Sequence, residues 1–223
     1  MMNATEQGEF EAYFVIVNFN DGSRVMRLTQ KSATCRGVAF LGHGTVASSL
    51  LDFLGINEIR KEIVMFVAEK KIGDAAIEEV TKDLRLDKPN HGIAFSLPVT
   101  RLVSPRIEHS NANMRIRGEN IMYEAIFVIA DHGKGALIVD SAKRAGSSGA
   151  TLINARGSGI LESNMPFAME IEPEQEIVLI LSDSSVSEQI IEAVIRENDL
   201  LTPGNGILFT CDVTKSIGLY TKS

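Results

Sequence analysis

The chain has 223 residues, a formal net charge of −7 and 44% apolar residues, which is ordinary for a folded globular protein. This acidic balance argues against a general nucleic-acid binder, because such proteins usually present a basic face. The N-terminal residues are acidic rather than basic, and no run approaches the roughly 20 apolar residues of a membrane helix. We therefore expect a cytoplasmic protein without membrane insertion, in which Cys35 and Cys211 are free thiols.

The first half of the chain alternates strand and helix patterns. Runs of β-branched and aromatic residues predict strands, whereas Ile77, Val80 and Leu84 recur at helical spacing. The predicted order is strand 13–19, helix 24–32, strand 38–41, strand 62–68, helix 75–84 and strand 92–99.

A polar segment rich in Asn and Ser follows, at residues 105–120. It has weak periodicity and is predicted to be a linker between a domain at 12–104 and a domain at 121–223. Its three arginines form either a basic patch or part of a solvated connector.

The second half has the same order of patterns. Ser185 and Glu188 have the spacing of a capping box, so a helix is predicted to begin there. This helix is expected to stop near Leu201, because Pro203 and Gly204 follow. The other predicted elements are strand 124–130, helix 135–144, strand 150–155, strand 176–181 and strand 207–213.

Short sequences recur between the halves in the same order. The offset is 113 residues for the first match and 114 for the other three. The matched runs are Phe14-Val15-Ile16 with Phe127-Val128-Ile129, Glu62-Ile63-Val64 with Glu176-Ile177-Val178, Gly92-Ile93-Ala94-Phe95 with Gly206-Ile207-Leu208-Phe209, and Val99-Thr100-Arg101 with Val213-Thr214-Lys215. They indicate a tandem duplication.

The duplicated order β-α-β-β-α-β predicts an α+β protein with two tandem ferredoxin-like domains. Each domain would have an antiparallel sheet with two helices on one face. The other sheet face would then need cover from the sister domain or from another chain.

Glycine-rich turns are the candidate parts of a ligand cleft. Arg156-Gly157-Ser158-Gly159 follows a predicted strand, and Gly204-Asn205-Gly206 precedes one. Glycines allow backbone N–H groups to approach an anion closely, and Arg156 would add charge. Alternatively, the glycines only permit tight turns at strand ends.

The same residues carry a resemblance to the P-II family of nitrogen regulatory signal proteins, in a form with two P-II-like domains per chain. The similar parts, which span nearly the whole chain, are Gly149-Ala150-Thr151 leading into Arg156–Gly159, then Glu176-Ile177-Val178, and finally 202–209 with 212–215. The resemblance implies a regulator without enzymatic activity that forms trimers and binds ADP or ATP in clefts between subunits. Some family members also sense 2-oxoglutarate. They act on a transporter, an enzyme or a transcription factor through the loop between the second and third strands, here roughly 45–59 and 160–173.

The resemblance also implies which residues bind the ligand. Thr151 would lie near an adenine. The full set is Thr151, Arg156, Gly157, Ser158, Gly159, Gly204, Asn205 and Gly206 in the second half, with Gly42, Gly44 and Gly92 in the first.

The sequence departs from the family where the family carries lysines. The lysine that follows the Gly-x-Gly turn corresponds to Ile207 and Ile93, and another corresponds to Glu172 and Glu58. Fewer cations should weaken the binding of a triphosphate, because phosphate contacts are largely electrostatic.

Three hypotheses follow for the function. The first is a P-II-like sensor of a small anionic metabolite or nucleotide that regulates a partner protein. The second is a degenerate interaction scaffold that no longer binds nucleotide. The third is a small enzyme with a site near His43 and His91, although no histidine or cysteine has metal-type spacing.

Overall fold

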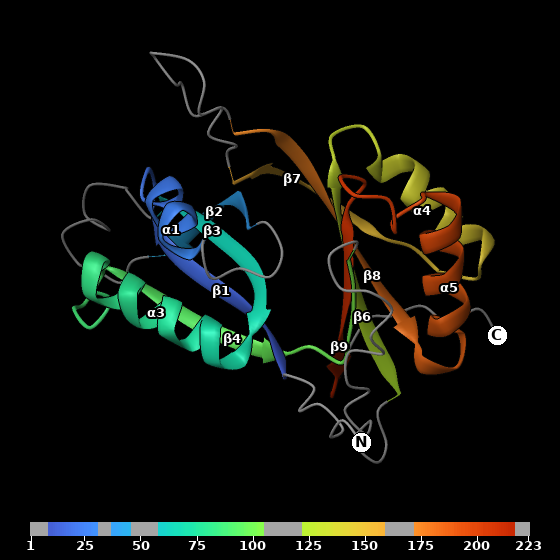
Figure 1. The fold of residues 1–223 in the computed structure, drawn as a ribbon, viewed down its shortest axis with the longest axis horizontal. Helices are drawn as coiled ribbons and strands as arrows, with labels where there is room; N and C mark the ends of the chain where they lie inside the picture. The colour runs from blue at the N-terminus through green and yellow to red at the C-terminus, as the bar shows by residue number, and fades with distance from the viewer. Residues whose placement is uncertain (1–8, 31–36, 46–57, 105–121, 159–171, 217–223) are drawn as a thin grey trace, which may run out of the picture. The chain divides into compact units, whose positions relative to one another are not determined.

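The computed structural model describes residues 9–30, 37–45, 58–104, 122–158 and 172–216, and its fold is α+β (Figure 1). The first half contains β1 (Phe10–Asn18), α1 (Gly22–Thr29), β2 (Val38–Thr45), β3 (Glu58–Glu69), α3 (Lys70–Leu84), β4 (Gly92–Pro98) and β5 (Arg101–Val103). The second half contains β6 (Tyr123–Asp131), α4 (Gly135–Arg144), β7 (Thr151–Gly157), β8 (Glu174–Asp183), α5 (Ser184–Glu197) and β9 (Ile207–Val213). The predicted order of elements is confirmed in both halves, and β5 is an additional strand.

The strands follow the hydrogen-bonded order β4-β1-β3-β2-β7-β8-β6-β9-β5. Within each half, this places the fourth strand beside the first, and the third beside the first and the second, as in a ferredoxin-like motif. In the second half, β6 lies between β8 and β9 and pairs antiparallel with both, so that Val128 is opposite Val178 and Leu208.

The described residues form two compact units that exchange segments between the halves. The N-unit holds residues 12–30, 37–45, 58–96, 155–158, 172 and 173, and the C-unit holds 9–11, 97–104, 122–154 and 174–216. The N-unit therefore includes the end of β7, and the C-unit includes β5. The predicted linker at 105–120 lies outside the described residues, so the predicted domain boundary stays a prediction.

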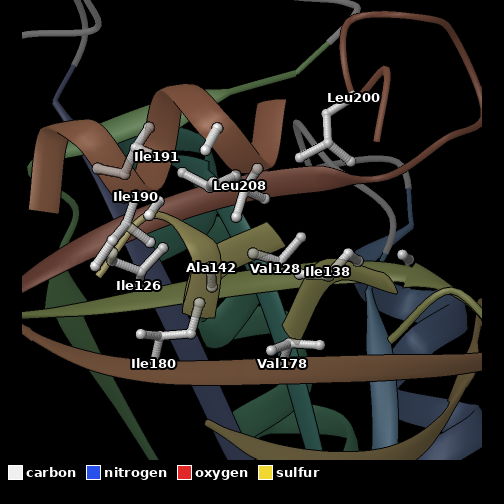
Figure 2. Close-up of a cluster of buried hydrophobic side chains, with 14 residues drawn as sticks. Ile126, Val128, Ile138, Ala142, Val178, Ile180, Ile190, Ile191, Leu200 and Leu208 are labelled. Carbon is white, nitrogen blue, oxygen red and sulfur yellow. The ribbon is translucent and has the colours of Figure 1, made fainter. Parts of the chain in front are cut away.

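Each unit has an apolar core between its two helices and one face of its strands. In the C-unit, alternate residues of β6, such as Ile126 and Val128, pack with Ile138 of α4 and Ile190 of α5 (Figure 2). In the N-unit, the matching positions on β1 and β3 pack with residues of α1 and α3. Burial of one face at a period of two explains why the strand pattern was readable in the sequence.

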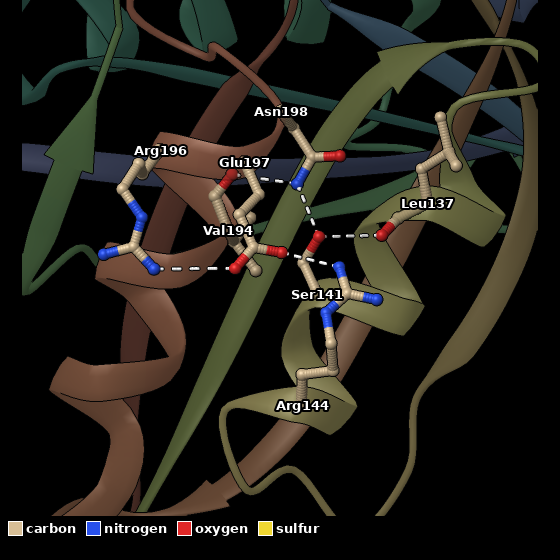
Figure 3. Close-up of polar contacts among 7 residues, drawn as sticks. All are labelled: Leu137, Ser141, Arg144, Val194, Arg196, Glu197 and Asn198. Carbon is tan, nitrogen blue, oxygen red and sulfur yellow. Dashed lines mark hydrogen bonds and ion pairs between the residues drawn. The ribbon is translucent and has the colours of Figure 1, made fainter.

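Polar contacts join α4 to α5 at the end of the C-unit core (Figure 3). Arg144 lies 2.6 Å from Glu197, and this hydrogen bond holds the pKa of Glu197 below its ordinary value. Asn198 donates from Nδ2 to Ser141 Oγ at 3.1 Å and to the carbonyl of Val194 at 2.9 Å. Asn198 therefore caps the last turn of α5 and also ties it to α4.

The predicted capping box at the start of α5 is wrong. The N-cap is Asp183, whose carboxylate accepts the backbone N–H of Ser185 at 2.8 Å. Hydrogen bonds from the side chain and backbone of Ser185 hold the pKa of Asp183 below its ordinary value. Glu188 instead pairs with Arg101 at 2.5 Å, a contact from β5 that the local sequence did not reveal.

Two predicted boundaries also differ from the structure. The strand expected at 38–41 continues to Thr45, because Gly42 and Gly44 pair with Lys61 and Ile59 of β3. The last helix ends at Glu197 rather than near Leu201, and turns fill the interval before β9.

Neighbouring residues of α4 allow a matched test of the C-unit core. Ile138 is fully buried, whereas Leu137 is 62% exposed. Ile138→Ala should lower the free energy of unfolding by about 2–5 kcal/mol through lost burial and a cavity, and Leu137→Ala by less than about 0.5 kcal/mol. Urea denaturation monitored by circular dichroism would measure both, and similar losses for the two variants would contradict the assignment of the core.

Candidate functional site

A buried carboxylate on β3 meets the N-terminus of α1. Glu62 is 4% exposed, and its Oε2 accepts the backbone N–H of Gly22 at 2.6 Å. A carboxylate is favourable there, because the first N–H groups of a helix lack partners and carry partial positive charge. A Cβ atom at Gly22 would lie 2.5 Å from this oxygen, so the close approach requires glycine.

The second half repeats this contact. Glu176 of β8 is 5% exposed, and its Oε2 accepts the backbone N–H of Gly135 at 2.7 Å. The sequence signal was present, because Glu62 and Glu176 begin one of the recurring runs. The recurring run alone does not show that the glutamate contacts a helix start, or which one.

The other oxygen of each glutamate meets a different side chain in the two units. In the N-unit, Arg156 lies 2.8 Å from Glu62 Oε1, also donates to Ser23 Oγ at 2.8 Å, and pairs with Glu172. In the C-unit, His132 Nδ1 lies 3.2 Å from Glu176 Oε1. The duplicated carboxylate is thus matched by a permanent charge in one copy and by a histidine in the other.

We call Ser23, Glu62, Arg156 and Glu172 the Arg156 cluster. The Arg156 side chain is 27% exposed, and those of Glu62 and Glu172 are 5% and 20% exposed. Arg156, predicted to supply charge to a ligand, is therefore engaged by two carboxylates of the chain itself. Glu172, where the family carries a lysine, is one of them.

The glycine-rich run that follows Arg156 begins within strand β7 rather than in a turn. Gly157 is buried and donates its N–H to the carbonyl of Pro173 at 2.7 Å. Ser158 donates its N–H to the carbonyl of Gly37 at 2.9 Å. These two N–H groups already have partners, and Gly159 lies outside the described residues.

The second glycine turn belongs to the C-unit. Gly204 and Gly206 have φ angles of +97° and +138°, and a Cβ at Gly206 would lie 2.4 Å from the carbonyl oxygen of Ile129. Lys134, just before α4, donates to Asn205 Oδ1 at 3.0 Å. Turn geometry accounts for both glycines, and a ligand role for Gly204, Asn205 and Gly206 stays a prediction.

The remaining predicted site residues lie on strands or strand ends. Thr151 is exposed at the start of β7, in the C-unit, and Gly42 and Gly44 lie within β2. Gly92 has a φ of +146°, and a Cβ there would lie 2.6 Å from the carbonyl oxygen of Ile16. The ligand roles of these four residues remain untested.

The described contacts of His43 and His91 add no support to the hypothesis of an enzyme site near them. His91 Nδ1 lies 2.9 Å from the carbonyl oxygen of Leu84, which ties it to the end of α3, and His43 is exposed on β2. Within the described residues, no group of three or more His, Cys, Asp or Glu side chains is placed to hold a metal ion. No helix in the same part of the chain is long and apolar enough to cross a membrane.

Cys211 on β9 is a free and buried thiol. Burial, followed by the charges of Asp212, Glu124 and Glu11, raises the pKa of Cys211 to about 12. The thiolate is the nucleophilic form of cysteine, so the native thiol is protonated at neutral pH and poorly reactive.

Replacing each of the two matched glutamates would compare the contributions of their different partners, Arg156 and His132. Glu62→Gln should lower the free energy of unfolding by roughly 2–4 kcal/mol, because it leaves a mostly buried guanidinium with one carboxylate. Glu176→Gln should cost about 1 kcal/mol, because His132 is largely exposed to water. Chemical denaturation at pH 7 would compare both variants with the exposed control Glu78→Gln. Equal losses of unfolding free energy in Glu62→Gln and Glu176→Gln would show that the guanidinium of Arg156 is unimportant.

The buried thiol predicts slow chemical modification and a loss of stability in alkali. In a Cys35→Ser background, Cys211 should react with a disulfide reagent at pH 8 only after unfolding, whereas an added Leu137→Cys thiol should react at once. Since the folded pKa lies above the ordinary value of 9.0, the protonated thiol favours folding below pH 9, and this contribution falls as the pH rises toward 12. Rapid modification of folded protein would contradict the burial.

The solved structures named in this paragraph are distantly similar to this chain. No family model matches the sequence, and no curated protein matches it. The GlnK–ATP complex of B. subtilis is similar over 43% of this chain and 85% of GlnK, with 16% identity and a TM-score of 0.36. A microcompartment protein from Desulfitobacterium hafniense is similar over 92% of this chain and 95% of its own, with 13% identity and a TM-score of 0.27. An anthrone oxidase-like protein is similar over 97% and 98%, with 10% identity and a TM-score of 0.26. The structural similarity to a P-II protein thus covers less of the chain than the sequence resemblance suggested.

Proposed function

We propose that this chain is a non-enzymatic, cytoplasmic signal-transduction protein similar to P-II. It binds a small anionic metabolite or nucleotide and regulates a partner protein, as an oligomer of its own copies. The observation that supports this proposal is the Arg156 cluster, in which one mostly buried guanidinium is held by two carboxylates of unequal exposure.

A guanidinium recognises carboxylates and phosphates through paired N–H donors, so the cluster has the chemistry of an anion site. Glu62 is fixed by the N–H of Gly22 as well as by Arg156. Glu172 is more exposed, and Arg156 is its ion-pair partner among the described residues. A ligand carboxylate or phosphate would therefore displace Glu172 rather than Glu62.

Displacement of Glu172 would connect binding to a response. Arg156 lies just before the sequence that corresponds to the partner-binding loop of the P-II family, roughly residues 160–173, and Glu172 lies near the end of that sequence. Next to Arg156 and Glu172 in sequence, the N–H of Gly157 donates a hydrogen bond to the carbonyl of Pro173. When a ligand replaces Glu172 at Arg156, the charge at the end of that sequence changes. The partner protein responds to this change through altered binding.

The alternative is a scaffold that has lost its ligand. It is favoured by the internal pairing of Arg156 with two acidic groups and by the absence of the family lysines at Ile207 and Ile93. In that case Arg156 only fastens the end of β7 to the N-unit. The two functions differ in whether an anion competes with Glu172.

Isothermal titration would test the sensor with ADP, ATP and AMP, each with and without 2-oxoglutarate and Mg²⁺. We expect micromolar binding of at least one of these ligands. Glu172→Gln should tighten it about fivefold, as expected for removal of a competing, partly exposed ion pair of about 1 kcal/mol. Arg156→Gln should weaken it at least tenfold, since hydrogen bonds to charged groups contribute about 1.5–3 kcal/mol.

Matched variants separate binding from folding. Glu174→Gln removes an exposed carboxylate two residues further along and should leave the affinity unchanged. Arg156→Lys keeps the charge without the planar fork and should give an intermediate loss. If neither the natural chain nor Glu172→Gln bound any of these ligands, the hypothesis of a nucleotide or 2-oxoglutarate sensor would be rejected. The scaffold would then be favoured.

A further inference from the structure

Strand β4 ends the hydrogen-bonded order of strands. It pairs with β1 on one side, and no described residue continues the sheet on the other. Its sequence, Gly-Ile-Ala-Phe-Ser-Leu-Pro, contains no charged residue. Natural edge strands usually carry charges, prolines or bulges that prevent pairing with another chain, and in β4 the only such residue is Pro98, at its last position.

An apolar stripe lies along β4. Ile93, Phe95 and Leu97 alternate in sequence and are therefore on one face, with exposed fractions of 59%, 44% and 39%. The ring of Phe95 stacks on Phe14 of β1, with ring centroids 5.0 Å apart. Its position is thus set by the neighbouring strand while much of its surface remains exposed.

Strand β9, the counterpart of β4 in the repeat, shows how a further strand can pair with this edge. Phe209, which matches Phe95 in the repeat, stacks on Phe127 in the same way at 4.8 Å but is fully buried. Strand β5 runs antiparallel along its edge and places Leu102 opposite Phe209. By the repeat, residues 94–96 of β4 are the positions that would receive an antiparallel strand.

The second half does not provide an equivalent of β5 in the described chain. The residues that correspond to Thr100, Arg101 and Leu102 are Thr214, Lys215 and Ser216, and they belong to no strand. Leu102 is 2% exposed, and serine in its place lacks the apolar side chain that packs there. Among the described residues, none therefore covers on β4 the edge that β5 covers on β9.

We propose that β4 pairs antiparallel with β4 of a second copy of this chain. A two-fold axis through Phe95 places Phe95 opposite its own counterpart and Ile93 opposite Leu97 of the partner subunit, so the stripe is self-complementary. Each chain carries a net charge of −7, and the uncharged β4 lets two copies approach without like charges on the paired strands. The contact produces an even number of copies and is independent of ligand binding at Arg156.

Light scattering after size-exclusion chromatography tests this pairing. The natural chain should have the mass of a dimer or of a larger even assembly, and Phe95→Lys should halve the mass by placing two ammonium groups opposite each other. Leu137→Lys, at an exposed position of α4, should leave the mass unchanged. Circular dichroism would check that both variants remain folded.

Cysteine cross-linking tests the register. In a Cys35→Ser background, Phe95→Cys should form a disulfide-linked dimer under mild oxidation, because residues opposite each other in antiparallel strands have Cα atoms about 4.5–5.5 Å apart. Ile93→Cys should not, because it faces a different residue. A monomer at every soluble concentration, an odd-numbered assembly, a mass unaffected by Phe95→Lys, or equal cross-linking of the two cysteine variants would overturn the proposal.

Discussion

A buried glutamate at the N-terminus of the first helix organises both halves of this protein. The carboxylates of Glu62 and Glu176 accept the N–H groups of Gly22 and Gly135, at 2.6 and 2.7 Å. A buried carboxylate is costly unless it is paired and hydrogen-bonded, so each glutamate fixes the distance between a strand and a helix and also requires a nearby partner for its other oxygen. If water instead of a glutamate bound the N–H groups at the helix start, the distance between the strand and the helix would not be fixed.

The need for a partner at the second carboxylate oxygen explains how the duplicated halves differ. The C-unit satisfies it locally with His132, in the turn before α4. The N-unit satisfies it with Arg156, which comes from the second half of the sequence through β7. Two interactions thus hold residues 155–158 in the N-unit. One is the ion pair of Arg156 with Glu62, and the other is strand pairing, in which Ala39 of β2 lies opposite Arg156.

The sequence predicted the elements well because their signals are local. Alternation along β6 and helical spacing along α3 follow from burial of one face, and the repeat gave the same order twice. The capping box at Ser185 failed because Asp183 was a competing cap and Arg101, distant in sequence, engages Glu188. Such non-local pairs leave no periodic signal in a single sequence.

The candidate site was predictable only in part, for the same reason. Arg156 was singled out by its glycine neighbours, but its partners Ser23 and Glu62 lie more than 90 residues away in sequence. Glu172 corresponds in sequence to a lysine of the P-II family, and only the structure places it against Arg156. The glycines themselves were ambiguous, because a turn and an anion cradle need the same backbone freedom.

The pairing of Arg156 with Glu62 and Glu172 has one electrostatic consequence. The cluster contains one guanidinium and two carboxylates, so an added anion meets a net negative group unless it replaces one of them. A ligand with a single carboxylate can take the place of Glu172 at little cost in repulsion. A triphosphate would bring several charges toward Glu62, which is held in place by the helix start and cannot withdraw. Under the proposed function, the arrangement would therefore favour a small carboxylate-like ligand over ATP at this position.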